Sequence, residues 1–223
     1  YAKTVTLLPT HWPKVNEIMQ RNRRIGTSMT GVFEFAEVHG WNTLRNWCID
    51  GVKVVEYYDN TYSRWLGIRE SIRNCSIKPS GTTSLLWGAT PGQHAPVASG
   101  WFLRLVRAAL GSPELQFAQE AGYFTEPDVK DPENTWVIYY PVEGQNVRSE
   151  REVPLFEQMA LAALLQRHWA DNMVSATFKF KPEEEDQSAS ARRAFEGQLK
   201  CMSFLPLGEE LSAGAYPQMP YQN

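Results

Sequence analysis

The chain has 223 residues, of which 43% are hydrophobic, and a formal net charge of -3. This length and hydrophobic fraction support a folded core and exclude a largely disordered chain. The mild charge argues against a nucleic-acid-binding surface or a cationic membrane patch, and no apolar run reaches the roughly 18 residues of a membrane span.

The three cysteines, Cys48, Cys75 and Cys201, are far apart and odd in number. None forms a CxxC or a Cys/His spacing, so the sequence predicts no metal site. Unpaired cysteines indicate a reducing, intracellular compartment such as the cytoplasm. The chain begins at Tyr1 without a methionine and ends in YPQMPYQN, and both ends suggest a fragment of a longer chain.

The first third of the chain predicts a strand followed by helices. Residues 4–8, TVTLL, are β-branched and apolar, which is typical of a strand. A helix is expected next, with Thr10 as its N-cap and Pro13 in its first turn. A long amphipathic pattern then runs over residues 32–68, with an interruption near Gly40.

The middle of the chain predicts a second helix and a strand. Residues 98–110, ASGWFLRLVRAAL, carry apolar side chains at helical spacing, and Gly111 and Pro113 would end this helix. The buried side of the helix would consist of Phe102, Leu103, Val106 and Leu110. Trp136–Tyr140 is a run of β-forming residues and predicts a strand.

The last third alternates helices with strands. A clear helical pattern covers residues 152–172, and an alternating strand covers 173–180. The acidic stretch 181–190 predicts a solvated loop or a helix start. A short helix over 191–200 and a final strand over 201–207 complete the chain.

Strands that alternate with long helices indicate an α/β protein with largely parallel strands. No internal repeat and no linker-like break is visible, so residues 1–223 are expected to form a single domain or part of one. Within it, His168, Trp169 and Asn172 close the helix over 152–172, and capping or core roles are expected for them. Tyr139 and Tyr140 are expected to pack within their strand.

The least ordinary stretch is a turn rich in small hydroxyl residues, at positions 79–84. Gly81 permits close backbone approach, and neighbouring amides can point into one concavity that suits a phosphate or carboxylate. Hydroxyl donors would come from Ser80, Thr82, Thr83 and Ser84. The turn is neither a Walker A motif nor a GxGxxG motif. On its residues alone, an ordinary polar loop is the more common explanation.

Four segments together resemble the adenosylcobalamin-dependent (class II) ribonucleotide reductases, in particular the ribonucleoside-triphosphate reductases. They are RNRRIGTSMTG at 21–31, IKPSGTTSLLWGATPGQHAP at 77–96, LLQRHWADNMVSATFKF at 164–180 and SFLPL with YPQMPY within 203–221. The segments follow the order found in that family and span nearly the whole chain. The resemblance implies the C-terminal half of a catalytic domain that is a ten-stranded α/β barrel.

The resemblance also implies roles for two loops. In the family, the Pro-Ser-Gly-Thr segment holds the phosphates of the substrate nucleotide, a role that would fall here to Ser80, Gly81, Thr82, Thr83 and Ser84. The following GATPGQHAP would border the substrate and the cobalamin. Its candidate cofactor contacts are Gly88, Gly92 and His94, although a structural role for the histidine is the alternative.

The reaction implied is the reduction of a ribonucleoside triphosphate to a deoxyribonucleotide by thiyl radical chemistry that adenosylcobalamin initiates. Thioredoxin or a similar dithiol would supply electrons, and a dNTP effector would bind elsewhere in the full chain. The family's Asn-Pro-Cys-x-Glu loop is absent and would lie upstream of Tyr1, while its tail cysteine pair would lie beyond Asn223. No catalytic residue is therefore expected in this segment.

Two other functions fit the same residues. The chain could be a catalytically silent nucleotide-binding module from a split or divergent reductase. It could also be an unrelated α/β enzyme that binds phosphate.

Overall fold

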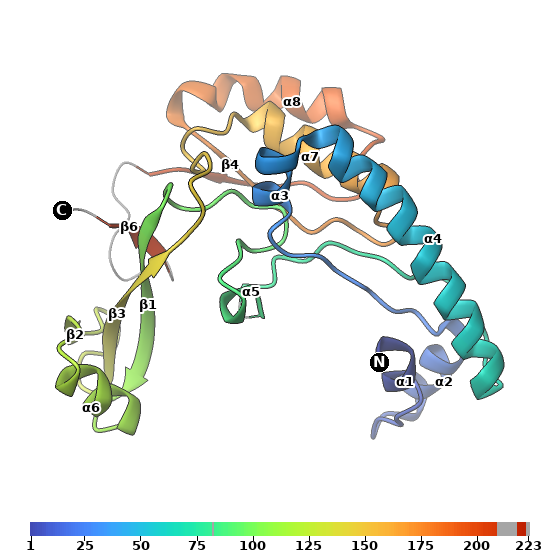
Figure 1. Cartoon of the computed structure of the whole chain (residues 1–223), viewed down its shortest axis with the longest axis horizontal. Helices are drawn as coiled ribbons and strands as arrows, with labels where there is room; N and C mark the ends of the chain where they lie inside the picture. Colours follow the sequence, from blue (N-terminus) through green and yellow to red (C-terminus); the bar gives the residue numbers. More distant parts are fainter. Residues whose placement is uncertain (82, 209–217, 222–223) are drawn as a thin grey trace. The chain divides into compact units, whose positions relative to one another are not determined.

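The computed structural model describes residues 1–81, 83–208 and 218–221 (Figure 1). The chain folds into two compact units, although the sequence shows no linker between them. Residues 1–94 and 154–206 form the first unit, and residues 95–153 and 207–223 form the second. Among the helices that the structure describes, none is long and apolar enough to cross a membrane.

The first unit is mainly helical. Its helices are α1 (Ala2–Val5), α2 (Pro13–Asn22), α3 (Val32–His39), α4 (Trp41–Leu66), α5 (Thr83–Leu86), α7 (Leu155–His168), the 3-10 helix η1 (Pro182–Gln187) and α8 (Ser188–Phe195). Helix α4 packs against α7, and α7 packs against α8 (Figure 1). The predicted helical stretch over 32–68 is confirmed, and Gly40 separates α3 from α4 as expected.

Short parallel β pairings link the segments between these helices. Thr27 pairs with Cys75, and Ile77 pairs with Val174, in parallel bridges. Strand β4 (Thr177–Phe180) continues from the second bridge and pairs in parallel with β5 (Ser203–Pro206). Because helices connect each of these segments to the next, the α/β prediction is confirmed for this unit. The strands in the described residues are too few for a ten-stranded barrel, which stays a prediction.

The second unit is an antiparallel sheet. It contains β1 (Trp101–Ala109), α6 (Pro113–Glu120), β2 (Thr125–Pro127), β3 (Thr135–Glu143) and β6 (Gln218–Pro220). The strand order is β2-β3-β1-β6, and each neighbouring pair is antiparallel. Helix α6 packs against the sheet through Leu115 and Ala118, which join Ile138 in a buried cluster. The predicted strand at Trp136–Tyr140 lies within β3.

The predicted helix over 98–110 is wrong, because Trp101–Ala109 forms strand β1. Every residue of β1 pairs with β3, from Trp101 opposite Glu143 to Ala109 opposite Thr135. Phe102 is buried, but Val106 and Leu110 are exposed, which a helix with the expected apolar face would not allow. Apolar residues at mixed spacing fit the period of a helix as well as that of a strand. Pairing with the distant strand β3 makes this segment a strand.

The predicted strand over 4–8 is also wrong, because this segment begins in α1 and continues as a turn. Lys3 of α1 is 4% exposed at the side chain and forms an ion pair with Asp59 of α4, with 2.8 Å between Nζ and Oδ1. This anchor, together with the helical turn, outweighs the β propensity of Thr4 and Val5.

One acidic residue of the stretch 181–190 is not solvated as expected. Glu184 is buried, and its Oε1 accepts a hydrogen bond from the Leu155 amide at 2.9 Å. Its Oε2 accepts from the Lys181 amide at 3.0 Å. The carboxylate therefore satisfies an amide at the first turn of α7, where the helix dipole favours negative charge.

Candidate functional site

Three segments distant in sequence lie side by side around the Ser/Thr turn. The amides of Ile25 and Thr27 donate to the carbonyls of Arg73 and Asn74 at 3.0 and 2.8 Å. The Gly31 amide donates to the Thr90 carbonyl at 2.9 Å. Segments 25–31 and 88–94 thus flank the stretch that leads into the turn at 79–84.

Ser80 and Ser84 use their hydroxyl groups inside the turn. The Ser84 amide and its Oγ donate to the Ser80 carbonyl at 3.0 and 2.7 Å, and Ser84 is fully buried. Ser80 Oγ donates to Thr30 Oγ1 at 3.1 Å and accepts from the Gly92 amide at 3.2 Å. These two serines therefore shape the turn.

Gly81 and Thr83 present the exposed face of the same turn. A Cβ on Gly81 would meet no atom within 4 Å, so a ligand has room to approach the backbone there. The Thr83 side chain is exposed at the start of α5. Thr82, the remaining residue predicted to bind phosphate, lies outside the described residues.

The three predicted cofactor contacts in the loop that follows, Gly88, Gly92 and His94, have different surroundings. Gly88 has open space where a Cβ would stand, which suits close approach of a group. Gly92 is instead required by the chain itself, because a Cβ there would overlap the Lys78 carbonyl oxygen. The loop therefore leaves space beside its backbone at Gly88 and none at Gly92.

Both ring nitrogens of His94 are engaged within the chain. Nδ1 lies 2.9 Å from the Pro91 carbonyl oxygen, and Nε2 lies 3.2 Å from the Thr177 amide nitrogen. A carbonyl accepts and an amide donates, so this pairing is satisfied by a neutral imidazole with its proton on Nδ1. The geometry favours the structural role that the sequence left open.

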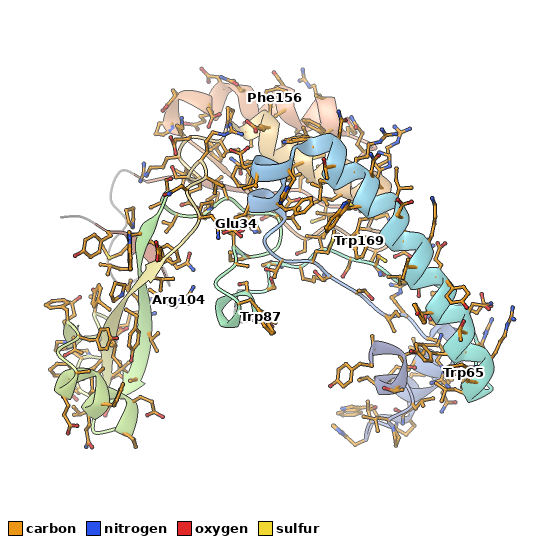
Figure 2. The ribbon with its side chains drawn as sticks, in the orientation of Figure 1. Glu34, Trp65, Trp87, Arg104, Phe156 and Trp169 are labelled. Atoms are coloured by element: carbon orange, nitrogen blue, oxygen red, sulfur yellow. The ribbon has the colours of Figure 1, made fainter. Side chains whose placement is uncertain are left out.

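Glu34 of α3, labelled in Figure 2, binds the loop at 88–94. Its Oε2 accepts a hydrogen bond from the Thr90 amide at 3.2 Å. Burial raises the pKa of the Glu34 carboxyl above its ordinary value, although the hydrogen bonds from Thr90 act in the opposite direction. Sequence reasoning missed this residue, because its partner lies 56 positions away.

Residues just after α7 hold the segment that enters the turn. Asp171 accepts hydrogen bonds from the amides of Asn74 and Cys75, each at 2.8 Å. Asn172 Nδ2 donates to the carbonyls of Ile25 and Cys75 at 3.0 and 2.9 Å. Trp169 is buried, and its Nε1 donates to a carbonyl of the same segment, that of Ser76. The roles expected for Trp169 and Asn172 thus extend to fixing the approach to the turn.

The second unit contains a concave surface of a different chemical character. A hollow of about 830 Å³ is lined mainly by aromatic and apolar side chains, among them Trp101, Tyr123, Phe124 and Tyr221. No charged side chain occurs among the described residues that line it. The hydroxyl donors in this hollow are set among aromatic rings, which suit an apolar or aromatic group better than a triphosphate.

Two of the three cysteines are buried thiols. Cys48 and Cys75 are each 1% exposed, whereas Cys201 is exposed. Burial raises the pKa of Cys48 to about 11 and is the main cause that raises the pKa of Cys75 to about 12. Both stay protonated at neutral pH and are poor nucleophiles. Within the described ranges, no group of three or more His, Cys, Asp or Glu side chains could hold a metal ion.

Thiol labelling should separate these cysteines. Iodoacetamide at pH 8 is expected to modify Cys201 in the native protein and to reach Cys48 and Cys75 after denaturation, because only thiolates that solvent can reach react quickly. Peptide mass spectrometry gives the sites and their rates. Native labelling of Cys75 as fast as that of Cys201 would contradict the buried, protonated state.

Comparison with known proteins confirms the resemblance drawn from the sequence. No protein-family model matches the chain. Adenosylcobalamin-dependent ribonucleoside-triphosphate reductase of Euglena gracilis is 47% identical over 224 residues, which cover 100% of this chain and 30% of the relative. The enzyme of the same name from Lactobacillus leichmannii is 33% identical over 236 residues, covering 92% of this chain and 32% of the relative.

A solved structure agrees with these relatives. The crystal structure of a B-12 dependent (class II) ribonucleotide reductase superposes with a TM-score of 0.88 at 30% identity. The match covers 99% of this chain and 34% of the solved chain. The chain therefore spans about a third of the length of the proteins that it matches, and their similarity extends along nearly all of it.

Proposed function

We propose that this chain is the part of an adenosylcobalamin-dependent ribonucleoside-triphosphate reductase that binds the phosphates of the substrate. Similarity along the whole chain to enzymes of that name supports the proposal. The assignment to the turn depends on one observation, that its residues fall into two groups. Ser80 and Ser84 hold its shape, while Gly81 and Thr83 face solvent.

The position of the turn in the fold supports the same role. The parallel bridges at Thr27 and Ile77 precede the residues that bind one another around the turn, Thr30 and Ser80. The turn therefore lies beyond the carboxyl ends of neighbouring parallel segments. Open α/β sheets bind ligands at this edge. In the complete enzyme these segments would belong to the C-terminal half of a ten-stranded barrel.

The activity belongs, in this proposal, to the complete enzyme. Its substrate would be a ribonucleoside triphosphate, its reductant thioredoxin or a similar dithiol, and its effector a dNTP bound outside this segment. Adenosylcobalamin would supply the radical when bound, and Gly88, which has open space where a Cβ would stand, is proposed as a residue that it approaches. None of Cys48, Cys75 and Cys201 lies in an Asn-Pro-Cys-x-Glu motif, so the thiyl cysteine is assigned to another part of the enzyme.

The turn is tested by removing a hydroxyl that faces solvent. In the full-length enzyme, Thr83→Val, alone and with Thr82→Val, should raise the KM for the ribonucleoside triphosphate about tenfold or more. A hydrogen bond to a charged group contributes about 1.5–3 kcal/mol, and 1.4 kcal/mol corresponds to about tenfold. Steady-state kinetics of deoxynucleotide formation measures the change.

Thr61→Val is the matched control for this experiment, because the Thr61 hydroxyl donates to Tyr57 of its own helix at 2.9 Å. This variant should leave KM unchanged. An unchanged KM in Thr83→Val would remove the turn from the substrate site. Nucleotide binding by the full-length protein without turnover would favour the silent nucleotide-binding module.

A further inference from the structure

Thr30 lies at the centre of the hydrogen bonds that join the three segments around the turn. Its Oγ1 donates to the Thr90 carbonyl at 2.7 Å and accepts from Ser80 Oγ at 3.1 Å. The Gly92 amide lies 3.4 Å from the same oxygen. One side chain thus contacts residues 50, 60 and 62 positions further along the chain.

The proton of each hydroxyl fixes the direction of this network. Thr30 has one hydroxyl proton, which the Thr90 carbonyl accepts, so Ser80 must be the donor in the bond between Ser80 and Thr30. Ser80 Oγ in turn accepts from the Gly92 amide at 3.2 Å. The hydroxyl of Ser80 therefore has a defined orientation only while Thr30 accepts its proton.

Ser80 needs this support because of its backbone. Its φ is 49°, in the left-handed region that residues with a Cβ rarely adopt. Its carbonyl also accepts both hydrogen bonds from Ser84 at the start of α5. A change at Ser80 would consequently move Gly81 and Thr83, the exposed residues on either side of position 82.

We propose that Thr30 is a positioning residue for the substrate triphosphate. It holds Ser80 in the conformation that presents Gly81 and Thr83, and it does not itself contact the phosphates. This inference rests on the proposed function of the turn at 79–84. It assigns to the TSMTG segment a role in phosphate affinity that acts through Ser80.

The experiment compares Thr30→Val, which keeps the shape without the hydroxyl, with Thr30→Ser, which keeps the hydroxyl. In the full-length enzyme, inorganic tripolyphosphate serves as a competitive inhibitor that probes the phosphate site alone. Thr30→Val should raise the tripolyphosphate inhibition constant and the nucleotide KM about fivefold to tenfold, with kcat changed less than twofold. Thr30→Ser and the control Thr61→Val should remain within twofold of the natural enzyme. Ser80→Ala, which removes the other end of the same bond, should reproduce the effect of Thr30→Val.

Each result decides the proposal. Unchanged tripolyphosphate inhibition in Thr30→Val, with or without a lower Tm, would overturn it in favour of a purely structural threonine. Equal losses in Thr30→Val and Thr30→Ser would overturn it in favour of packing by the methyl group. Should Thr30→Val fail to fold, natural inhibition by tripolyphosphate in Ser80→Ala would overturn it. An unchanged inhibition constant in Thr83→Val would instead count against the proposed function of the turn.

Discussion

Gly92→Ala is expected to destabilise the protein by about 3 kcal/mol, far more than Gly88→Ala in the same loop. Both glycines have positive φ, 55° and 64°, which costs an L residue about 1–2 kcal/mol. They differ in surroundings, because a Cβ on Gly92 would overlap the Lys78 carbonyl oxygen, while a Cβ on Gly88 would enter open space. Relieving that overlap requires a backbone shift, and overpacking of this kind adds about 1–3 kcal/mol.

The shift should also reach the candidate site, because the Gly92 amide donates to Ser80 Oγ. Thermal unfolding and the KM for the ribonucleoside triphosphate should therefore both change in Gly92→Ala. Gly88→Ala should show a small loss in Tm and, if the cofactor approaches there, weaker adenosylcobalamin binding. Equal losses of Tm in the two variants would show that backbone strain alone determines the effect.

Asp59→Asn is expected to cost about 3–5 kcal/mol of folding free energy, as does the loss of one partner from a buried ion pair. Lys3 and Asp59 are 4% and 3% exposed at their side chains, and the ammonium also donates to the Arg69 carbonyl at 2.9 Å. Removing the carboxylate charge leaves a buried ammonium without its counter-charge, which is strongly destabilising. Chemical denaturation measures the loss.

Asp50→Asn is the matched control on the same helix. Asp50 pairs with Lys53 at 2.9 Å, but these side chains are 75% and 69% exposed. Exposed pairs of this kind contribute about 0.5 kcal/mol, so the control should behave nearly as the natural protein. Similar losses in Asp59→Asn and Asp50→Asn would contradict the importance of burial.

The pair at Lys3 and Asp59 also predicts a dependence on pH. Burial alone would raise the pKa of Asp59, but hydrogen bonds from Lys3 and Ser71 outweigh burial and hold the pKa below its ordinary value. A carboxyl with a lowered folded pKa contributes fully above its unfolded pKa, near pH 4, and loses the contribution as pH falls through the folded pKa. The deficit of Asp59→Asn should accordingly shrink below about pH 4.

The elements that sequence predicted well are those whose pattern is long and local. Helix α4 extends over seven turns of amphipathic spacing (about 3.6 residues a turn), and α7 carries buried Leu155, Met159 and Ala162 on one face. Strand β1 was mistaken for a helix because its partner β3 begins only after α6 and β2. Residues 98–110 contain no sequence pattern that indicates this partner strand.

The candidate site, too, was predictable only where nearby residues determine it. Composition located the turn, since glycine and hydroxyl residues are concentrated there. It could not divide them into Ser80 and Ser84, which shape the turn, and Gly81 and Thr83, which stay exposed. That division depends on Thr30, 50 positions earlier in the chain. The hydroxyl-rich TSMTG segment was a signal that could have identified it.

The discontinuity of the first unit has a consequence for the order in which the chain folds. The second unit interrupts the first in the sequence. The hydrogen bond from Asn172 to the Cys75 carbonyl therefore cannot form until the 97 positions after Cys75 have been synthesised. The β1–β3 pairing, by contrast, involves only residues 101–143 and can form while the ribosome is still adding α7. Contacts of long sequence separation slow folding. The phosphate turn would thus be among the last parts to acquire its shape, and the apolar surfaces of α3 and α4 would stay exposed to aggregation or chaperones until then.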